Sequence, residues 1–258
     1  MLKGDLIDRT GEINYNKFGS KMIISKYRGA NDLDIYFPKY NWTFYNNAWN
    51  NFQKGAVVCP YEPRTCGVGY LGEGKYKTKE NGKTTINYNI WHGMFKRCYS
   101  NYKNDESYEG CEVFKDWHDF QNAAKWIDEN YYEVPGEKMC LDKDILFHGN
   151  KIYSPKTCLI VPERINKLFT KSTKSRGEYP IGVRERRNRL IAYCSITENN
   201  KTKQVNLGRF PLHQVEEAFL TYKRFKENYI KQVADEYKKS IPDKVYQALY
   251  NYKVEITD

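Results

Sequence analysis

Hydrophobic and polar positions alternate in the first quarter of the chain. Between residues 21 and 60, the short runs MIISKYR, LDIYF, WTFYNNAW and AVVCPY are separated by glycine and by Asn-Asp. Alternation of this kind is typical of strands that bury one face of an antiparallel sheet. The pattern predicts a small β-rich domain in the first 80 residues.

Helical spacing replaces the alternation in the middle of the chain. Apolar residues recur every three or four positions in residues 87–102 and in VFKDWHDFQNAAKWI, which begins at Val113. The segment LDKDILFHGNKIYSPKTCLIVPERIN, residues 141–166, then predicts a strand, a turn at Gly149-Asn150, a second strand and a helix. We therefore expect a ββα core with flanking helices over residues 81–170.

The last part of the chain returns to strands before it ends in helices. After KSTKSRGEYP, which predicts a linker, come the strand-length runs GVRERR, LIAYCSITE and KQVNLGRF and a long amphipathic helix. The final segment, YKKSIPDKVYQALYNYKV, predicts a terminal helix. The whole pattern predicts an α+β protein of three parts: an SH3-like β domain at 1–80, the ββα core at 81–170, and a three-stranded sheet with C-terminal helices at 178–258.

Charge points to a polyanionic partner. The chain has 42 Lys and Arg against 32 Asp and Glu, a net charge of +10, and a pI near 9.0. A basic protein attracts nucleic acid through a sequence-independent term that releases counterions. Nucleic acid is therefore the first partner to consider.

Cysteine and histidine usage argues against a zinc finger. The seven cysteines form no Cys-x-x-Cys pair, and only four histidines could complete a metal cluster. Free thiols are typical of a reducing compartment, and no apolar run is long enough to span a membrane. We expect a cytoplasmic protein with no membrane partner.

A glycine-rich segment resembles a nucleotide fingerprint by spacing alone. Gly67, Gly69 and Gly72 in GVGYLGEGKY have the G-x-G-x-x-G spacing, but no buried strand precedes them and no helix follows. A dinucleotide site needs both, because the helix N-terminus binds the pyrophosphate. The segment is predicted to be a mobile connecting loop.

Residues 141–166 have the outline of a ββα metal nuclease. In such a site an acid at the end of a strand and a residue on the helix hold a divalent cation, and a histidine deprotonates water. Asp142 stands in the acid position, Asn150 in the turn and Asn166 on the helix. With WHGMFKRCY and YEGCEVFKDWHDF upstream, the run from residue 91 to 166 resembles phage-encoded HNH endonuclease-like proteins. The resemblance implies Mg²⁺ or another divalent cation at Asp142 and Asn166, and a turn shaped by Asn150 and Tyr153.

The chain departs from that pattern at the general base. Lys143 occupies the position of the histidine, and an ordinary lysine is protonated at neutral pH. Catalysis would require a depressed pKa at Lys143, a role for Lys143 as a cation facing the phosphate, or substitution by His148. The alternative is a scaffold that has lost its chemistry.

A cluster of positive charge lies in the last predicted sheet. Residues 180–210 contain seven Lys or Arg against two Glu, and in a strand Arg184 and Arg186 share one face while Arg187 lies on the other. GVRERRNRLIAYCSITENNKTKQVNLGRFPLHQVEEAFLTY is similar to the AP2 DNA-binding domain, although Ile191 replaces its usual tryptophan. That family contacts DNA through its sheet. The expected DNA-binding residues are Arg184, Arg186, Arg187, Arg189, Lys203 and Arg209.

Together these patterns predict a cytoplasmic protein that binds double-stranded DNA. The resemblance to phage proteins implies the cytoplasm of an infected host cell if the protein is phage-encoded. The sequence leaves open whether it is a metal-dependent endonuclease or nickase, or a catalytically inactive scaffold. An inactive scaffold would act as a DNA-binding regulator or as a phage inhibitor of a host protein.

Overall fold

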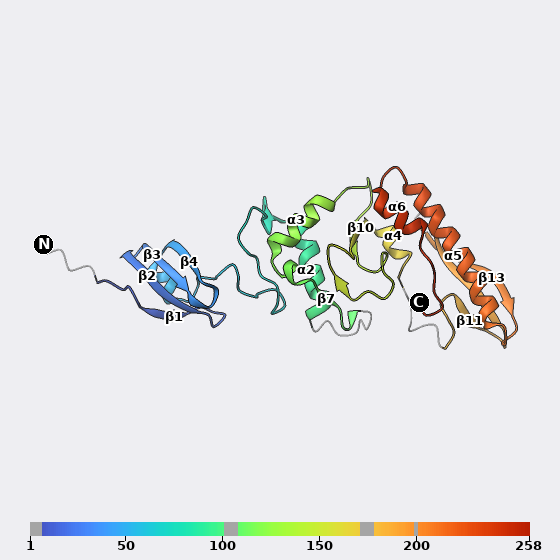
Figure 1. Cartoon of the computed structure of the whole chain (residues 1–258), viewed down its shortest axis with the longest axis horizontal. Coiled ribbons are helices and arrows are strands. Elements are labelled where there is room, and N and C mark those ends of the chain that lie inside the picture. Colours follow the sequence, from blue (N-terminus) through green and yellow to red (C-terminus); the bar gives the residue numbers. More distant parts are fainter. Residues whose placement is uncertain (1–6, 101–107, 171–177, 199–200) are drawn as a thin grey trace. The chain divides into compact units, whose positions relative to one another are not determined.

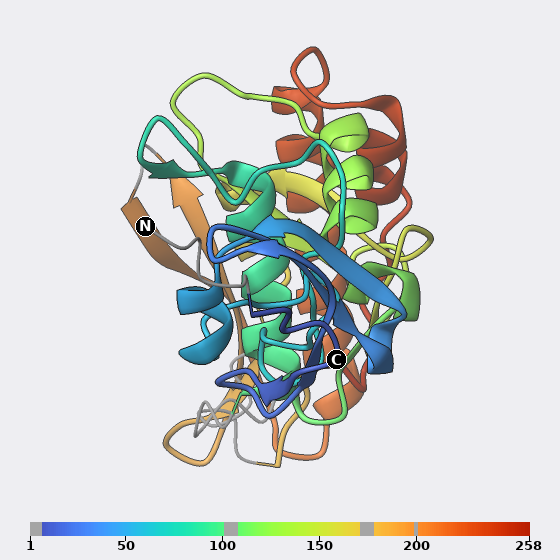
Figure 2. The same cartoon turned by 90° about the vertical axis from the view of Figure 1, so that its left-hand side faces the viewer.

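The computed structural model describes residues 7–100, 108–170, 178–198 and 201–258. It contains 31% helix and 28% strand in several small sheets, which confirms the α+β class. The chain forms two compact units, one of residues 1–107 with 113–125 and one of residues 108–112 with 126–258. Figures 1 and 2 show the helices and strands of the chain in two views, coloured along the sequence. Most of the linker expected at 171–180 lies outside the described residues. None of the described helices has the length and apolar character that crossing a membrane requires.

The first unit begins with a four-stranded antiparallel meander, drawn in blue in Figure 1. Alternate residues of the two central strands, among them Met22, Ile24, Leu33 and Ile35, are fully buried and form its core. The alternation visible in the sequence is therefore the alternation of the sheet's two faces. The elements are β1 (Ile13–Tyr15), β2 (Lys21–Gly29), β3 (Asp32–Phe37), a 3-10 turn (Pro38–Tyr40), β4 (Trp42–Asn47) and α1 (Trp49–Gln53).

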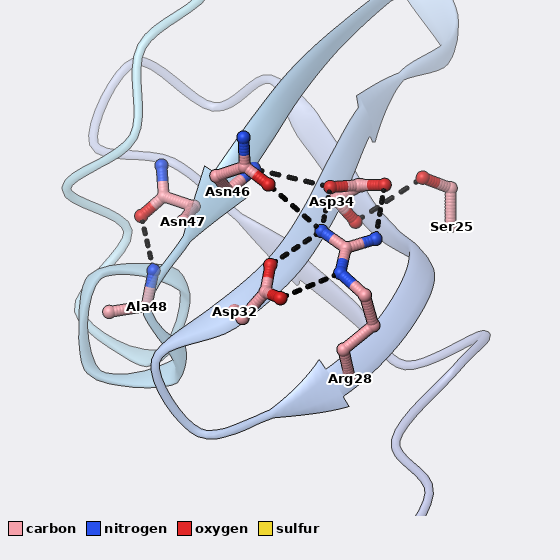
Figure 3. A network of polar contacts seen from close by, with 7 residues as sticks. All are labelled: Ser25, Arg28, Asp32, Asp34, Asn46, Asn47 and Ala48. Carbon is pink, nitrogen blue, oxygen red and sulfur yellow. Dashed lines mark hydrogen bonds and ion pairs between the residues drawn. The ribbon is translucent and has the colours of Figure 1, made fainter.

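A polar network joins three strands of this sheet at one end (Figure 3). The Arg28 guanidinium donates to both carboxylate oxygens of Asp32, at 2.6 and 2.8 Å, and to both of Asp34, at 2.6 and 2.9 Å. Asp34 also accepts from the Asn46 backbone N–H at 3.2 Å. Because Asp34 is only 7% exposed, these bonds compensate for the burial of its charge.

Two helices with an aromatic interface complete the first unit. The Thr85 side chain accepts a hydrogen bond from Tyr88 N–H and caps the first of them. The rings of Trp91 and Phe95 lie 4.8 Å apart, and Trp91 lies 5.3 Å from Phe120. The elements are β5 (Lys79–Glu80), β6 (Lys83–Thr84), α2 (Ile86–Tyr99), a 3-10 turn (Lys115–His118) and α3 (Phe120–Asn130), whose last residues belong to the second unit.

The glycine-rich segment, predicted to be a mobile loop, is instead fixed to these helices. Tyr70 N–H donates to His118 C=O, and Phe120 N–H donates to Tyr70 C=O. A Cβ at Gly69 would lie 2.8 Å from the Trp91 ring, and one at Gly72 would lie 2.1 Å from Asp119 Oδ1. The glycines therefore permit close packing against side chains, and no phosphate site is needed to explain them.

The second unit has one hydrophobic core, which joins segments expected to be separate domains. Val161 and Ile165 of the ββα element belong to the same buried cluster as Ala192 and Tyr222 near the C-terminus. The helix α5 packs along the three-stranded sheet, and α6 packs against α5 (Figure 1). The elements are β7 (Glu112–Val113, at the unit boundary), β8 (Met139–Asp142), β9 (Ile152–Tyr153), β10 (Leu159–Pro162), α4 (Glu163–Lys167), β11 (Val183–Glu185), β12 (Leu190–Glu198), β13 (Lys201–Phe210), α5 (Val215–Tyr237) and α6 (Asp243–Tyr250).

Candidate functional site

The segment LDKD…RIN forms a hairpin followed by a short helix. Strands β8 and β10 are antiparallel, with Asp142 opposite Leu159 and Met139 opposite Pro162. Helix α4 begins directly after Pro162 and packs against both strands. The order strand, loop, strand, helix thus agrees with the expected one, and Asp142 lies at the point where β8 enters the loop.

Asp142 is engaged in shaping that loop. Its Oδ1 accepts hydrogen bonds from the backbone N–H of Asp144, at 2.7 Å, and of Ile145, at 2.8 Å. Burial raises the pKa of the Asp142 carboxyl, although these two hydrogen bonds favour the anion. One carboxylate oxygen is therefore used to close a turn of the main chain.

Lys143 is buried, and its ammonium group is fully engaged. The residue is 4% exposed, and Nζ donates to both oxygens of Asp144, at 2.9 and 2.8 Å, and to Asn150 C=O at 2.8 Å. Burial alone lowers the pKa of Lys143, but the hydrogen bonds and charge of Asp144 outweigh it, and the net pKa is raised. This environment therefore does not give Lys143 the depressed pKa that a general base would need.

Asn150 closes the same loop from the other side. Its Nδ2 donates to Lys143 C=O and to Ile152 C=O, both at 2.8 Å, while Lys143 Nζ donates to the Asn150 carbonyl. The Tyr153 ring, 2% exposed, has its centroid 5.9 Å from Lys143 Nζ. Lys143 and Asn150 thus hold the loop by reciprocal hydrogen bonds over a buried aromatic ring.

His148 contacts the C-terminal segment. Its Nδ1 lies 3.1 Å from Asp258 Oδ1, and its ring centroid lies 4.4 Å from that of Tyr252. It borders a surface pocket of about 480 Å³ together with Lys244 and Gln247. These contacts occupy His148 on the side of the loop that faces the chain's last residues, and none of them joins it to Lys143 or Asp142.

The donors around the loop do not fit a divalent cation as they are arranged. Asn166 is partly exposed on α4. Asp142 Oδ1 accepts two N–H groups, and both oxygens of Asp144 bind the Lys143 ammonium, so three of the four carboxylate oxygens of these two residues are already engaged. Within the described ranges, no three His, Cys, Asp or Glu side chains cluster as a metal site would require.

The three-stranded sheet has one face against α5 and one face turned away from it. Val183, Leu190 and Ala192 belong to the core, whereas Ile191, also buried, lies outside that cluster. The register places Ile191 between Arg184 of β11 and Arg209 of β13. Arg184 and Arg209 therefore flank one apolar residue on the face away from α5.

The β11–β12 hairpin adds two more arginines to this face. Arg186 and Arg189 exchange backbone hydrogen bonds at 2.9 and 3.3 Å, and the two residues between them, Arg187 and Asn188, have φ of 53° and 62°. This is the geometry of a two-residue hairpin turn. Strand alternation then places Arg186 and Arg189 on the side of Arg184, with Arg187 exposed at the turn.

The Arg184 side chain is held in place across the sheet. Its Nη2 donates to Gln204 Oε1 at 2.8 Å, and its guanidinium carbon lies 4.5 Å from the centre of the Tyr193 ring. Its Nε is buried without a hydrogen-bond partner in the structure. Tyr193 and Gln204, which were not among the expected DNA-binding residues, are thus part of this face. Alternation along β12 from Ile191 was the signal that could have identified Tyr193.

Lys203 does not share this face. It pairs with Ile196, whose side chain is buried on the α5 side, so the side chain of Lys203 projects from that side as well. Of the six residues expected to bind DNA, the structure therefore brings four together: Arg184, Arg186, Arg189 and Arg209. We call these the arginine face.

Comparison with known proteins adds no relative: no family model matches the chain, and neither curated proteins nor solved structures include a significant match.

Proposed function

We propose that this chain is a double-stranded-DNA-binding protein that contacts DNA through the arginine face, and that its ββα element is a scaffold without nuclease activity. The observation that carries the proposal is the placement of Arg184, Arg186, Arg189 and Arg209 on one side of a small sheet. The resemblance of this segment to AP2 domains, and of residues 91–166 to phage HNH proteins, agrees with it.

The chemistry of the arginine face suits a DNA groove. A strand ribbon can enter the major groove, and arginine donates two hydrogen bonds to guanine O6 and N7. Arg184 is fixed by Gln204 and Tyr193, so it loses little side-chain freedom on binding. The exposed Arg186, Arg189 and Arg209 can contact phosphates around it.

The side-chain contacts of the ββα element support the proposal that it is a scaffold without nuclease activity. A general base must be neutral before it accepts a proton, and Lys143 is a buried cation bound to Asp144. His148, the substitute, is paired with Asp258. The loop that would carry out catalysis is thus closed by its own side chains.

Duplex binding by the full chain tests this function. Fluorescence anisotropy with a labelled duplex, measured at several salt concentrations, should show binding that weakens as salt rises. Arg209→Ala should weaken binding of all duplexes and reduce the salt slope by about one, because it removes a phosphate contact. Arg184→Ala should weaken binding by about tenfold and relax sequence preference.

Lys203→Ala is the matched control, because Lys203 lies on the same strand as Arg209 but projects from the opposite face. Its duplex affinity should remain near that of the wild type. Equal losses in Lys203→Ala and Arg209→Ala would show that binding depends on net charge alone and would contradict an arginine face.

A further inference from the structure

Buried polar side chains hold the turn between β1 and β2 in place. Asn16 Oδ1 accepts from the backbone N–H of Phe18, at 3.0 Å, and of Ser20, at 2.9 Å. Asn16 Nδ2 donates to Glu62 at 2.8 Å, and the Ser20 hydroxyl donates to the other oxygen of that carboxylate. Asn16, Ser20 and Glu62 are all at most 6% exposed. Burying a carboxylate is costly, so these bonds hold the turn in one conformation.

This rigid turn presents aromatic rings and cations to solvent. Phe18 is 46% exposed, with Arg64 Cζ 5.2 Å and Lys17 Nζ 5.4 Å from the centre of its ring. Next to the turn, Tyr15 is 58% exposed and pairs with Lys21 across the two strands. We call Tyr15, Lys17, Phe18, Lys21 and Arg64 the aromatic-basic patch.

Most of the charge without an ion-pair partner in the segment that carries the patch, residues 7–64, is positive. Residues 7–64 contain eight Lys or Arg and five Asp or Glu. In the structure, Glu12 pairs with Arg9, Asp32 and Asp34 pair with Arg28 (Figure 3), and Glu62 is buried. Among these described residues only Asp8 remains as an exposed carboxylate without a cation partner. Six cations of the same segment have no carboxylate within ion-pair distance: Lys17, Lys21, Lys26, Lys39, Lys54 and Arg64.

We propose that the aromatic-basic patch binds single-stranded nucleic acid. A base would stack on Phe18 or Tyr15, and Lys17, Lys21 and Arg64 would contact the neighbouring phosphates. Exposed aromatic rings between cations suit this ligand because every base has a face to stack, whereas a duplex keeps its bases stacked inside. The fixed turn reduces the entropy lost on binding. This site lies in the other unit from the arginine face and does not depend on it.

Binding of a labelled oligothymidylate of about 20 nucleotides by the full chain tests the proposal. Phe18→Ala should weaken this binding by about tenfold, because it removes a stacking surface. Arg64→Ala should reduce the salt slope by about 0.7, the value for one phosphate contact on a single strand. Duplex affinity should change much less in Phe18→Ala, which separates this site from the arginine face.

Tyr45→Ala is the matched control. Tyr45 is 66% exposed on β4, at the opposite edge of the same sheet, so its loss removes a ring outside the patch that is more exposed than Phe18. Unchanged thermal unfolding would show that each variant is folded. The proposal is overturned if the wild type does not bind oligothymidylate, if Tyr45→Ala and Phe18→Ala weaken it equally, or if polyglutamate competes as well as oligothymidylate does.

Discussion

At the residue scale, Lys143 shows how one substitution changes the meaning of a motif. The sequence places a lysine where an HNH-like site would have a histidine, and this alone permits a depressed pKa or a contact with phosphate. The structure gives the ammonium three oxygen partners, two of them from Asp144 and one from Asn150. The lysine therefore stabilises the loop, which is a role that a neutral histidine could fill only in part.

The Arg28 network predicts how the stability of the first unit depends on pH. The hydrogen bonds from Arg28 hold the pKa of Asp34 below its ordinary value of 3.8. A depressed carboxyl pKa contributes stability above the unfolded pKa, and this contribution is lost as pH falls through the folded value. We expect Arg28→Met to lower the melting temperature at pH 6, and the difference from the wild type to shrink as pH falls from about 5 towards 3.

Circular dichroism melting of both proteins across this pH range measures the effect. Lys26→Met, on the same strand and without an ion pair, controls for the loss of a positive charge. A difference between wild type and Arg28→Met that stays constant down to pH 3 would mean that the carboxylates contribute no pH-dependent stability through Arg28.

At the scale of elements, local sequence patterns predicted where strands and turns form, whereas contacts between distant residues determined how some of these segments pack and pair. The strands of the meander and the hairpin at β11–β12 follow from alternation and turn chemistry, which short stretches specify. Tyr70 and Gly72 are held in place by residues at and next to Asp119, some 50 positions later in the chain. No local sequence pattern could predict these contacts. Likewise, Lys203 pairs with Ile196, beyond the irregularity between Ala192 and Tyr193 in the pairing of β12 with β13. This register places Lys203 on the side of α5 and not on the arginine face, where the sequence had led us to expect it.

Gly72 tests whether close packing fixes the glycine-rich segment. Its φ is +63°, and a Cβ would lie 2.1 Å from Asp119 Oδ1. Gly72→Ala should therefore lower the free energy of unfolding by about 2–4 kcal/mol, through backbone strain and displacement of Asp119. Gly82 also has a positive φ, +76°, but open space around it, so Gly82→Ala should cost only about 1 kcal/mol. Urea unfolding measures both; equal losses would mean that strain alone explains Gly72.

At the scale of the whole molecule, positive charge is distributed over two units with different chemistry. The arginine face belongs to the second unit and the aromatic-basic patch to the first. The net charge of +10 indicated a polyanionic partner from the sequence alone. It could not show which cations are neutralised by ion pairs with carboxylates in the folded chain. Arg28 and Lys143, for example, are both bound to carboxylates, so they add little to the field that a nucleic acid would meet.

The last prediction concerns cleavage by the full chain. Purified wild-type protein, incubated with supercoiled plasmid and Mg²⁺ or Mn²⁺, should leave the plasmid uncut at protein concentrations that shift it on a gel. The reason is that Lys143 is a bound cation, and that Asp142 and Asp144 already satisfy main-chain donors and the ammonium. Conversion to nicked or linear DNA that is lost in both Asp142→Ala and Asn166→Ala, but kept in Lys203→Ala, would contradict this prediction. It would mean that DNA binding opens the loop and frees Asp142 to hold a cation, so that the closed arrangement is a resting state of a nuclease.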